Sequence, residues 1–118
     1  MGSSAGSVIG TGNYSTFVGT GAGGTTVGKD NNTFVGGLAG YNTGSEYTSG
    51  NATHNVLVGY KAGYTNVSGD NNTLVGYNAD VSDSNYTNIV MIGASTATSG
   101  NNVLLTGYNT TSSVDNVV

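Results

Sequence analysis

Residues 71–76 read Asn-Asn-Thr-Leu-Val-Gly, and residues 31–36 read Asn-Asn-Thr-Phe-Val-Gly. The phrase joins a polar turn, two adjacent apolar residues and a final glycine, which we call the marker glycine. Looser copies end at Gly10, Gly19, Gly59, Gly93 and Gly107. A phrase that returns this regularly indicates a repeat protein, so the repeat is interpreted before any single residue.

The spacing of the marker glycines predicts the kind of repeat. The steps from Gly19 to Gly36, from Gly59 to Gly76 and from Gly76 to Gly93 are each 17 residues. A unit of this length is too short for a pair of helices but suits one turn of a β-solenoid. We therefore predict an all-β fold, a parallel β-roll of about seven short turns that stack about 4.8 Å apart.

The domain organisation follows from the irregular steps. The chain has 118 residues, so we expect one domain, 1–118, with irregular end turns at 1–14 and 94–118. The step from Gly36 to Gly59 is 23 residues. We place the extra residues in a polar loop insertion at about 44–53, because insertions in repeat proteins project as loops.

Charge and composition exclude two classes of partner. The formal net charge is −4, and the only cations are Lys29 and Lys61, so no basic face is available for nucleic acid. No apolar run has the length of a membrane helix, so we expect no membrane insertion. Short strands bounded by Gly, Asn and Asp, rather than helical periodicity, run through the chain.

The two adjacent apolar residues of each repeat face opposite ways on a strand. One face fills the roll, and the other leaves an apolar stripe, which is typical of an interaction surface. Thr33, Thr73 and Val56 share the side of the second apolar residue. We assign the interior to Val18, Val35, Val58, Val75 and Ile92. We assign the subunit interface to Phe17, Phe34, Leu57, Leu74 and Met91, with the reverse assignment left open.

The phrase resembles two known repeats. Asn-Thr-Phe-Val-Gly-x-x-Ala-Gly at residues 32–40 is similar to the head repeats of YadA-like trimeric autotransporter adhesins, and still more to the glycine-rich repeats of bacteriophage tail fibres. The resemblance covers roughly residues 7–109. It implies a parallel β-roll assembled as a parallel homotrimer, located on a virion or in an extracellular or cell-surface setting.

Three function classes remain open. The first is a non-enzymatic structural and binding module of a virion fibre or adhesin, a homotrimer or higher homo-oligomer that contacts a cell-surface receptor, a glycan or an adjoining virion protein. The second is a self-assembling extracellular filament, because open solenoid ends are unpaired strand edges. The third, less favoured, is an ice-binding solenoid. It needs a regular threonine array, which Val56, Val90 and Val103 interrupt.

Candidate contact residues for a receptor lie in two places. Glu46, Tyr47 and His54 bring the chain's rarer side chains to the inserted loop, which solenoids often place on the binding face. Tyr60 and Tyr77 each follow a marker glycine, so stacking of the turns predicts a tyrosine ladder. Such a ladder stabilises stacked strands, and it is also a platform on which sugar rings can stack.

Catalysis and cofactor binding are not indicated. Residues 23–29 fit most of a phosphate-binding loop, but Asp30 stands where Ser or Thr should hold magnesium, and no helix is predicted to follow. Asp80 and Asp83 offer oxygen ligands for calcium, yet the stretch lacks the glycine and closing glutamate of a calcium loop. We expect no enzyme activity, no cofactor and no metal.

Overall fold

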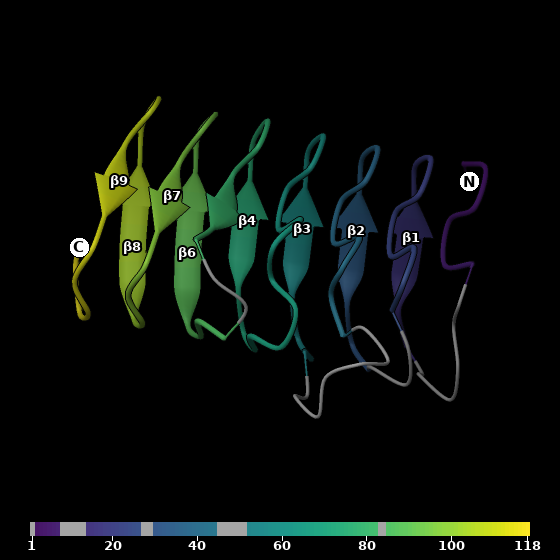
Figure 1. Cartoon of the computed structure of the whole chain (residues 1–118), viewed down its shortest axis with the longest axis horizontal. Coiled ribbons are helices and arrows are strands. Elements are labelled where there is room, and N and C mark those ends of the chain that lie inside the picture. Colours follow the sequence, from purple (N-terminus) through teal and green to yellow (C-terminus); the bar gives the residue numbers. More distant parts are fainter. Residues whose placement is uncertain (1, 8–13, 27–29, 45–51, 83–84) are drawn as a thin grey trace.

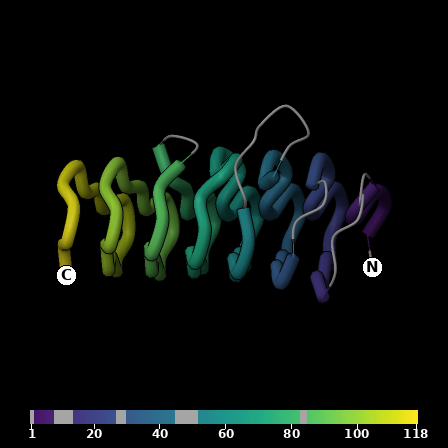
Figure 2. Tube along the Cα trace, turned by 90° about the horizontal axis from the view of Figure 1, so that it is seen from below, coloured from purple at the N-terminus to yellow at the C-terminus, as the bar shows by residue number. Residues whose placement is uncertain are grey.

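The computed structural model describes residues 2–7, 14–26, 30–44, 52–82 and 85–118. Within them, strands and turns form a parallel β-solenoid of about five turns, and no helix occurs. Figure 1 shows the strands side by side along the long axis, and Figure 2 shows the chain coiling around that axis. The predicted all-β parallel solenoid is therefore confirmed. The copy ending at Gly10 lies outside the described residues, and seven turns stay a prediction.

Two parallel sheets form the walls of the coil. Sheet B is short and has the order β5-β7-β9, with β5 at Asp80–Val81, β7 at Ala97–Thr98 and β9 at Thr111–Ser112. Sheet A runs along the coil in the order β1-β2-β3-β4-β6-β8. Its strands are β1 (Thr16–Val18), β2 (Thr33–Val35), β3 (Val56–Val58), β4 (Thr73–Val75), β6 (Ile89–Ile92) and β8 (Val103–Thr106).

The strands of sheet A pair without a register shift. The step of 23 residues between Gly36 and Gly59 leaves β2 and β3 aligned, with Phe34 opposite Leu57. The extra residues are therefore accommodated outside the sheet. The insertion predicted at 44–53 falls mostly on residues 45–51, which lie outside the described residues.

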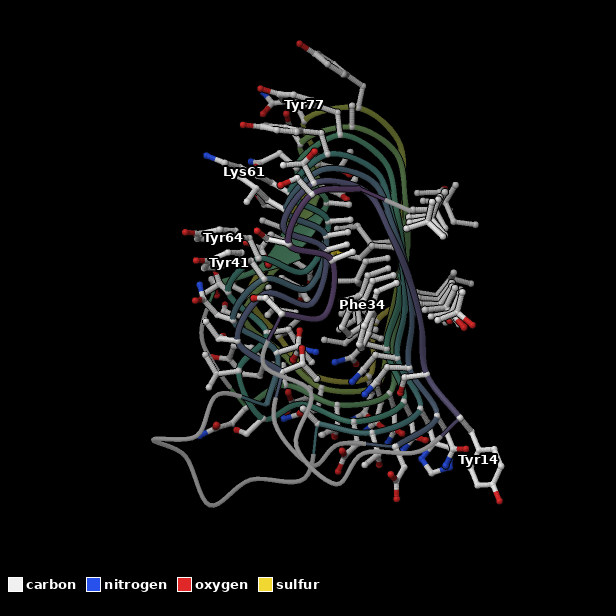
Figure 3. All side chains as sticks on the ribbon, turned by 90° about the vertical axis from the view of Figure 1, so that its right-hand side faces the viewer. Tyr14, Phe34, Tyr41, Lys61, Tyr64 and Tyr77 are labelled. Carbon is white, nitrogen blue, oxygen red and sulfur yellow. The ribbon has the colours of Figure 1, made fainter. Side chains whose placement is uncertain are left out.

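The first apolar residue of each pair fills the coil, so the assignment of the two stripes was wrong. Phe34 is fully buried in the coil (Figure 3) and stacks on Phe17 with ring centroids 5.0 Å apart. A Cβ added at Gly40 or Gly23 would collide with these rings, so glycine on the opposite wall makes room for them. The core includes Phe34, Leu57, Leu74 and Met91, all fully buried, with Phe17 partly buried against it. The residues expected inside (Val18, Val35, Val58, Val75 and Ile92) are exposed or half-buried.

Buried asparagines join successive turns at the corner that directly precedes the strands of sheet A. Asn32, Asn55 and Asn72 are fully buried. The Asn55 side chain donates to the carbonyl of Gly69 at 2.9 Å and accepts from the Asn72 backbone N–H at 3.0 Å. Asn32 repeats this with Ala52 and Asn55. Each amide thus satisfies a carbonyl and an N–H of the next turn. Leaving these groups unpaired in the interior would cost free energy.

The marker glycines form a backbone column. Gly36 has φ 132° and Gly59 has φ 135°, in a region open essentially to glycine alone. A Cβ at Gly36 would collide with the carbonyl oxygen of Gly59 in the next turn, and the same holds from Gly59 to Gly76. Side chains are therefore excluded here both by conformation and by the close approach of successive turns.

We expect Gly36→Ala to destabilise the protein by about 3 kcal/mol or more, because it combines a disfavoured φ with a backbone collision. Gly37→Ala is the matched control. Gly37 does not have a positive φ, and a Cβ there would meet the Tyr60 ring at 3.3 Å. Thermal unfolding of both variants checks the expectation, and equal melting temperatures would contradict it. Gly44 would not serve as a control, because it is buried with φ 66°.

We expect Asn55→Ala to destabilise the protein by about 2–4 kcal/mol, since it leaves the Asn72 N–H without a partner in the interior and removes one of the two side-chain amides that donate to the Gly69 carbonyl, the other being Asn66. Denaturant unfolding followed by circular dichroism measures the change. An unchanged unfolding midpoint would show that the asparagine column contributes little to stability.

Candidate functional site

The outward side of sheet A is the first candidate surface. We call it the outer sheet face. Its exposed apolar side chains include Val18, Val35, Val56 and Val90, and Ile92 is 50 % exposed. The register aligns these side chains in two straight columns along the coil. The face comprises Thr16, Val18, Thr33, Val35, Val56, Val58, Thr73, Val75, Val90, Ile92, Leu104 and Thr106.

The outer sheet face is flat, apolar and free of charged residues. Threonine is the only polar residue type on it. Adjacent strands place equivalent side chains about 4.8 Å apart, so the columns form a continuous surface rather than scattered apolar positions. An exposed apolar surface of this kind is a candidate for packing against another molecule.

The corner after sheet A is the second candidate surface. Tyr60 and Tyr77 lie in successive turns and stack with ring centroids 5.7 Å apart and planes 18° apart. Further round the corner, Tyr41 and Tyr64 stack with the same centroid distance and planes 13° apart. In Figure 3 the labelled Tyr41, Lys61, Tyr64 and Tyr77 project to one side of the coil. The predicted tyrosine ladder is present in the structure, and a second, parallel ladder accompanies it.

Lys61 links the two tyrosine ladders. Its Nζ lies 5.7 Å from the centroid of the Tyr60 ring and 5.5 Å from that of the Tyr64 ring. Both distances lie within reach of a cation–π interaction. The lysine therefore stabilises the aromatic corner and adds a positive charge to it.

The residues predicted near the inserted loop are only partly placed. Glu46 and Tyr47 lie outside the described residues. His54 is exposed, and its ring nitrogens lie 3.3 Å from the Asn31 side-chain nitrogen and 3.0 Å from the Thr53 hydroxyl. This position is at the corner before β3, whereas Tyr60 is at the corner after it. The three-residue strand β3 lies between the two corners, so His54 and Tyr60 do not form one site.

The Asp80 carboxylate forms hydrogen bonds to residues of its own turn and of the preceding turn. Its carboxylate accepts hydrogen bonds from the Thr65 backbone N–H at 3.0 Å, the Thr65 hydroxyl at 2.7 Å and the Val81 N–H at 2.9 Å. Burial raises the pKa of this carboxyl above its ordinary value, and the hydrogen bonds from Thr65 and Val81 oppose the rise. Asp83 lies outside the described residues, and those described hold no cluster of three or more metal-ligating side chains.

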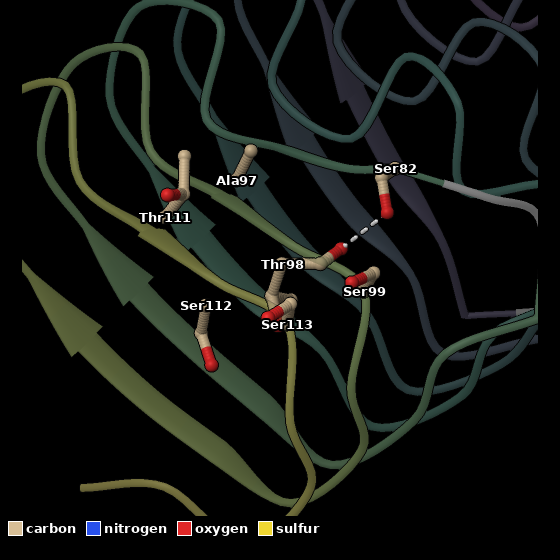
Figure 4. Close-up of a pocket in the computed structure, with 7 residues that line it drawn as sticks. All are labelled: Ser82, Ala97, Thr98, Ser99, Thr111, Ser112 and Ser113. Carbon is tan, nitrogen blue, oxygen red and sulfur yellow. Dashed lines mark hydrogen bonds between the residues drawn. The ribbon is translucent and has the colours of Figure 1, made fainter.

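A shallow depression of about 220 Å³ lies against sheet B (Figure 4). Its lining is almost entirely hydroxyl-bearing, and the Ser82 hydroxyl donates to the Thr98 carbonyl at 3.0 Å. None of the residues that line it is acidic, basic or charged. The lining residues are Ser82, Ala97, Thr98, Ser99, Thr111, Ser112 and Ser113.

Comparison with family models, with curated proteins and with solved structures gave no match. The resemblance to tail-fibre and adhesin repeats therefore remains a prediction that rests on the repeated phrase. Among the described residues, no helix is long and apolar enough to span a membrane.

Sequence reasoning missed the second tyrosine ladder and the orientation of the strands. The ladder had a signal, because Ala-Gly-Tyr occurs both at residues 39–41 and at residues 62–64. The orientation also had one, since Thr33 and Thr73 share the side of the second apolar residue, and threonine is more often exposed than buried.

We expect Asp80→Asn to change how stability depends on pH. Because the folded-state pKa of Asp80 is raised, its contribution to stability is greatest below the ordinary aspartate pKa and falls as pH rises through the raised value. The melting temperature of the parent minus that of the variant should therefore be larger at about pH 4 than at about pH 7. A constant difference across this range would contradict the expectation.

Proposed function

We propose that this chain is a non-enzymatic structural and binding module of a virion fibre or surface adhesin, assembled as a parallel homotrimer through the outer sheet face. The observation that carries the proposal is the pair of uncharged, β-branched columns on that face. Val18, Val35 and Ile92 are each at least 37 % exposed on a single chain. Covering them against two further copies removes apolar surface from water, which favours association.

The geometry of the face supports association between parallel copies. The strands of sheet A are all parallel and in register, so equivalent side chains recur at each rung along the coil. Three copies arranged around an axis parallel to the coil bring the same columns together at every rung. The number three comes from the resemblance of the repeat to trimeric fibre and adhesin repeats. A closed ring of identical subunits is an ordinary form of symmetric assembly.

The binding part of the proposal concerns the surfaces that a trimer leaves free. The tyrosine corner lies after the marker glycines and is separate from the outer sheet face. A receptor, a glycan or an adjoining virion protein would therefore meet the tyrosine corner or the inserted loop, while the outer sheet face holds the subunits together.

Two other assemblies are distinguished by the same measurement. A filament formed end to end would give an open distribution of masses, because head-to-tail contacts do not close. An ice-binding protein would remain monomeric and show thermal hysteresis. Its threonine column would be interrupted, since Thr33 and Thr73 alternate with Val56 and Val90.

The test is the double variant Val35→Glu, Ile92→Glu, measured by analytical ultracentrifugation. We expect the parent to sediment as a trimer and the variant as a folded monomer, because a trimer would bury six unpaired carboxylates at its centre. Ser82→Glu, an exposed position beside sheet B, is the control and should remain trimeric. A monomeric parent, or a trimer that persists in the double variant, would overturn the proposed interface.

A further inference from the structure

In one column of the tyrosine corner, two tyrosines are separated by a residue without a ring. Gly37, Tyr60, Tyr77, Ala94 and Tyr108 occupy equivalent places in successive turns. Backbone hydrogen bonds establish this alignment along the coil. In each turn, the N–H of the residue that follows the column member donates to the carbonyl of the column member one turn earlier. The donors and acceptors are Lys61 to Gly37 (2.9 Å), Asn78 to Tyr60 (2.8 Å), Ser95 to Tyr77 (2.8 Å) and Asn109 to Ala94 (3.0 Å).

The tyrosine rings of this column differ in how much of each ring face is covered by a neighbouring turn. The Tyr60 ring lies against Gly37 on one side and stacks on Tyr77 on the other. Tyr77 therefore has one face on Tyr60. The next turn on its other side carries Ala94 at the equivalent place, and a methyl group is too small to cover a ring. Tyr77 is 61 % exposed and Tyr108 is 79 % exposed. Two exposed rings thus flank a single small residue.

The width of this gap suits a saturated six-membered ring. Tyr77 and Tyr108 are two turns apart, or roughly 10 Å at the usual strand spacing. Carbon atoms in contact lie about 3.5–4.0 Å apart, so contact with both tyrosines uses most of the gap. The remainder fits a puckered ring better than a flat one, because the atoms of a puckered ring do not share a plane.

The column next to the tyrosines consists of residues with polar side chains at these turns. Asn78, Ser95 and Asn109 follow Tyr77, Ala94 and Tyr108 and have φ of 53°, 55° and 52°. Amide and hydroxyl groups both donate and accept hydrogen bonds, as sugar hydroxyls require. No charged residue stands in either column at these three turns, and the net charge of the chain is −4. These features favour a neutral ligand over a nucleotide or another anion.

We propose that the gap over Ala94 is a binding site for one pyranose ring of a neutral glycan, held between Tyr77 and Tyr108 and hydrogen-bonded by Asn78, Ser95 or Asn109. The inference deepens the binding part of the proposed function and rests on it, but it does not need the trimer. Each chain carries a complete site. In an oligomer several such sites act together, which strengthens a weak single contact.

The test measures binding of the labelled protein to a microarray of neutral oligosaccharides that includes glucose, galactose, mannose and N-acetylhexosamine termini. We expect the parent to bind a subset of them. Tyr108→Ala removes one wall and should lower the apparent affinity at least about tenfold, as expected for the loss of an aromatic stacking contact. Ala94→Tyr extends the tyrosine ladder into the gap and should abolish binding. Tyr14→Ala, which removes an exposed tyrosine at a different corner, should bind as the parent does.

Folding and assembly are checked on the same samples by circular dichroism and sedimentation. Tyr108 and Ala94 lie outside the core, so both variants should keep the parent's spectrum and mass. The proposal is overturned if the parent binds none of the oligosaccharides, or if Ala94→Tyr binds as tightly as the parent. It is also overturned if Ala94→Tyr changes the mass of the assembly, which would make the gap a contact between copies. The double variant in the outer sheet face should still bind sugar as a monomer, so failure of the trimer and failure of the sugar site are separable.

Discussion

The structure depends on the close approach of successive backbones at the marker glycines. Gly36, Gly59 and Gly76 share a φ between 132° and 145° and stack so closely that a single Cβ would meet the next carbonyl. Glycine at these positions lets adjacent turns approach to strand spacing, which the hydrogen-bonded parallel sheets require. The buried asparagines and the interior Phe and Leu side chains then pack at fixed positions in each turn. A side chain in place of a marker glycine would have to shift the next turn.

Much of the fold could be predicted from the sequence, because each repeat corresponds to one turn of the solenoid. The 17-residue step, the polar corners and the marker glycines predicted short parallel strands, and the structure has them. The direction of the side chains was harder to predict. Phe34 and Val35 are both apolar, so hydrophobicity alone could not decide which of them enters the coil. The deciding constraint was three-dimensional: the Phe34 ring needs the space that Gly40 leaves on the opposite wall.

The candidate surfaces were predictable to different degrees. The Tyr60 and Tyr77 ladder followed from equal spacing, since residues one repeat apart lie one turn apart. The gap between Tyr77 and Tyr108 did not follow as directly, because the step from Gly93 to Gly107 is shorter than the others. Only the observed register shows that this shorter turn still aligns Tyr108 with Ala94 and Tyr77. The inserted loop differs from both ladders. Its irregular step was visible in the sequence, but residues 45–51 lie outside the described residues.

The direction of the hydrogen bonds has a mechanical consequence. In this solenoid the bonds between turns run along the coil axis, so a force that pulls the two ends apart acts on every turn in series. The least stable step between turns then limits the load that a single chain can bear. The step between β6 and β8 aligns four residue pairs, whereas the step between β1 and β2 aligns three. The steps between β2 and β3, β3 and β4, and β4 and β6 also align three pairs, so rupture under tension would begin at one of these shorter steps rather than between β6 and β8. In the proposed trimer, three chains side by side would share that load in parallel.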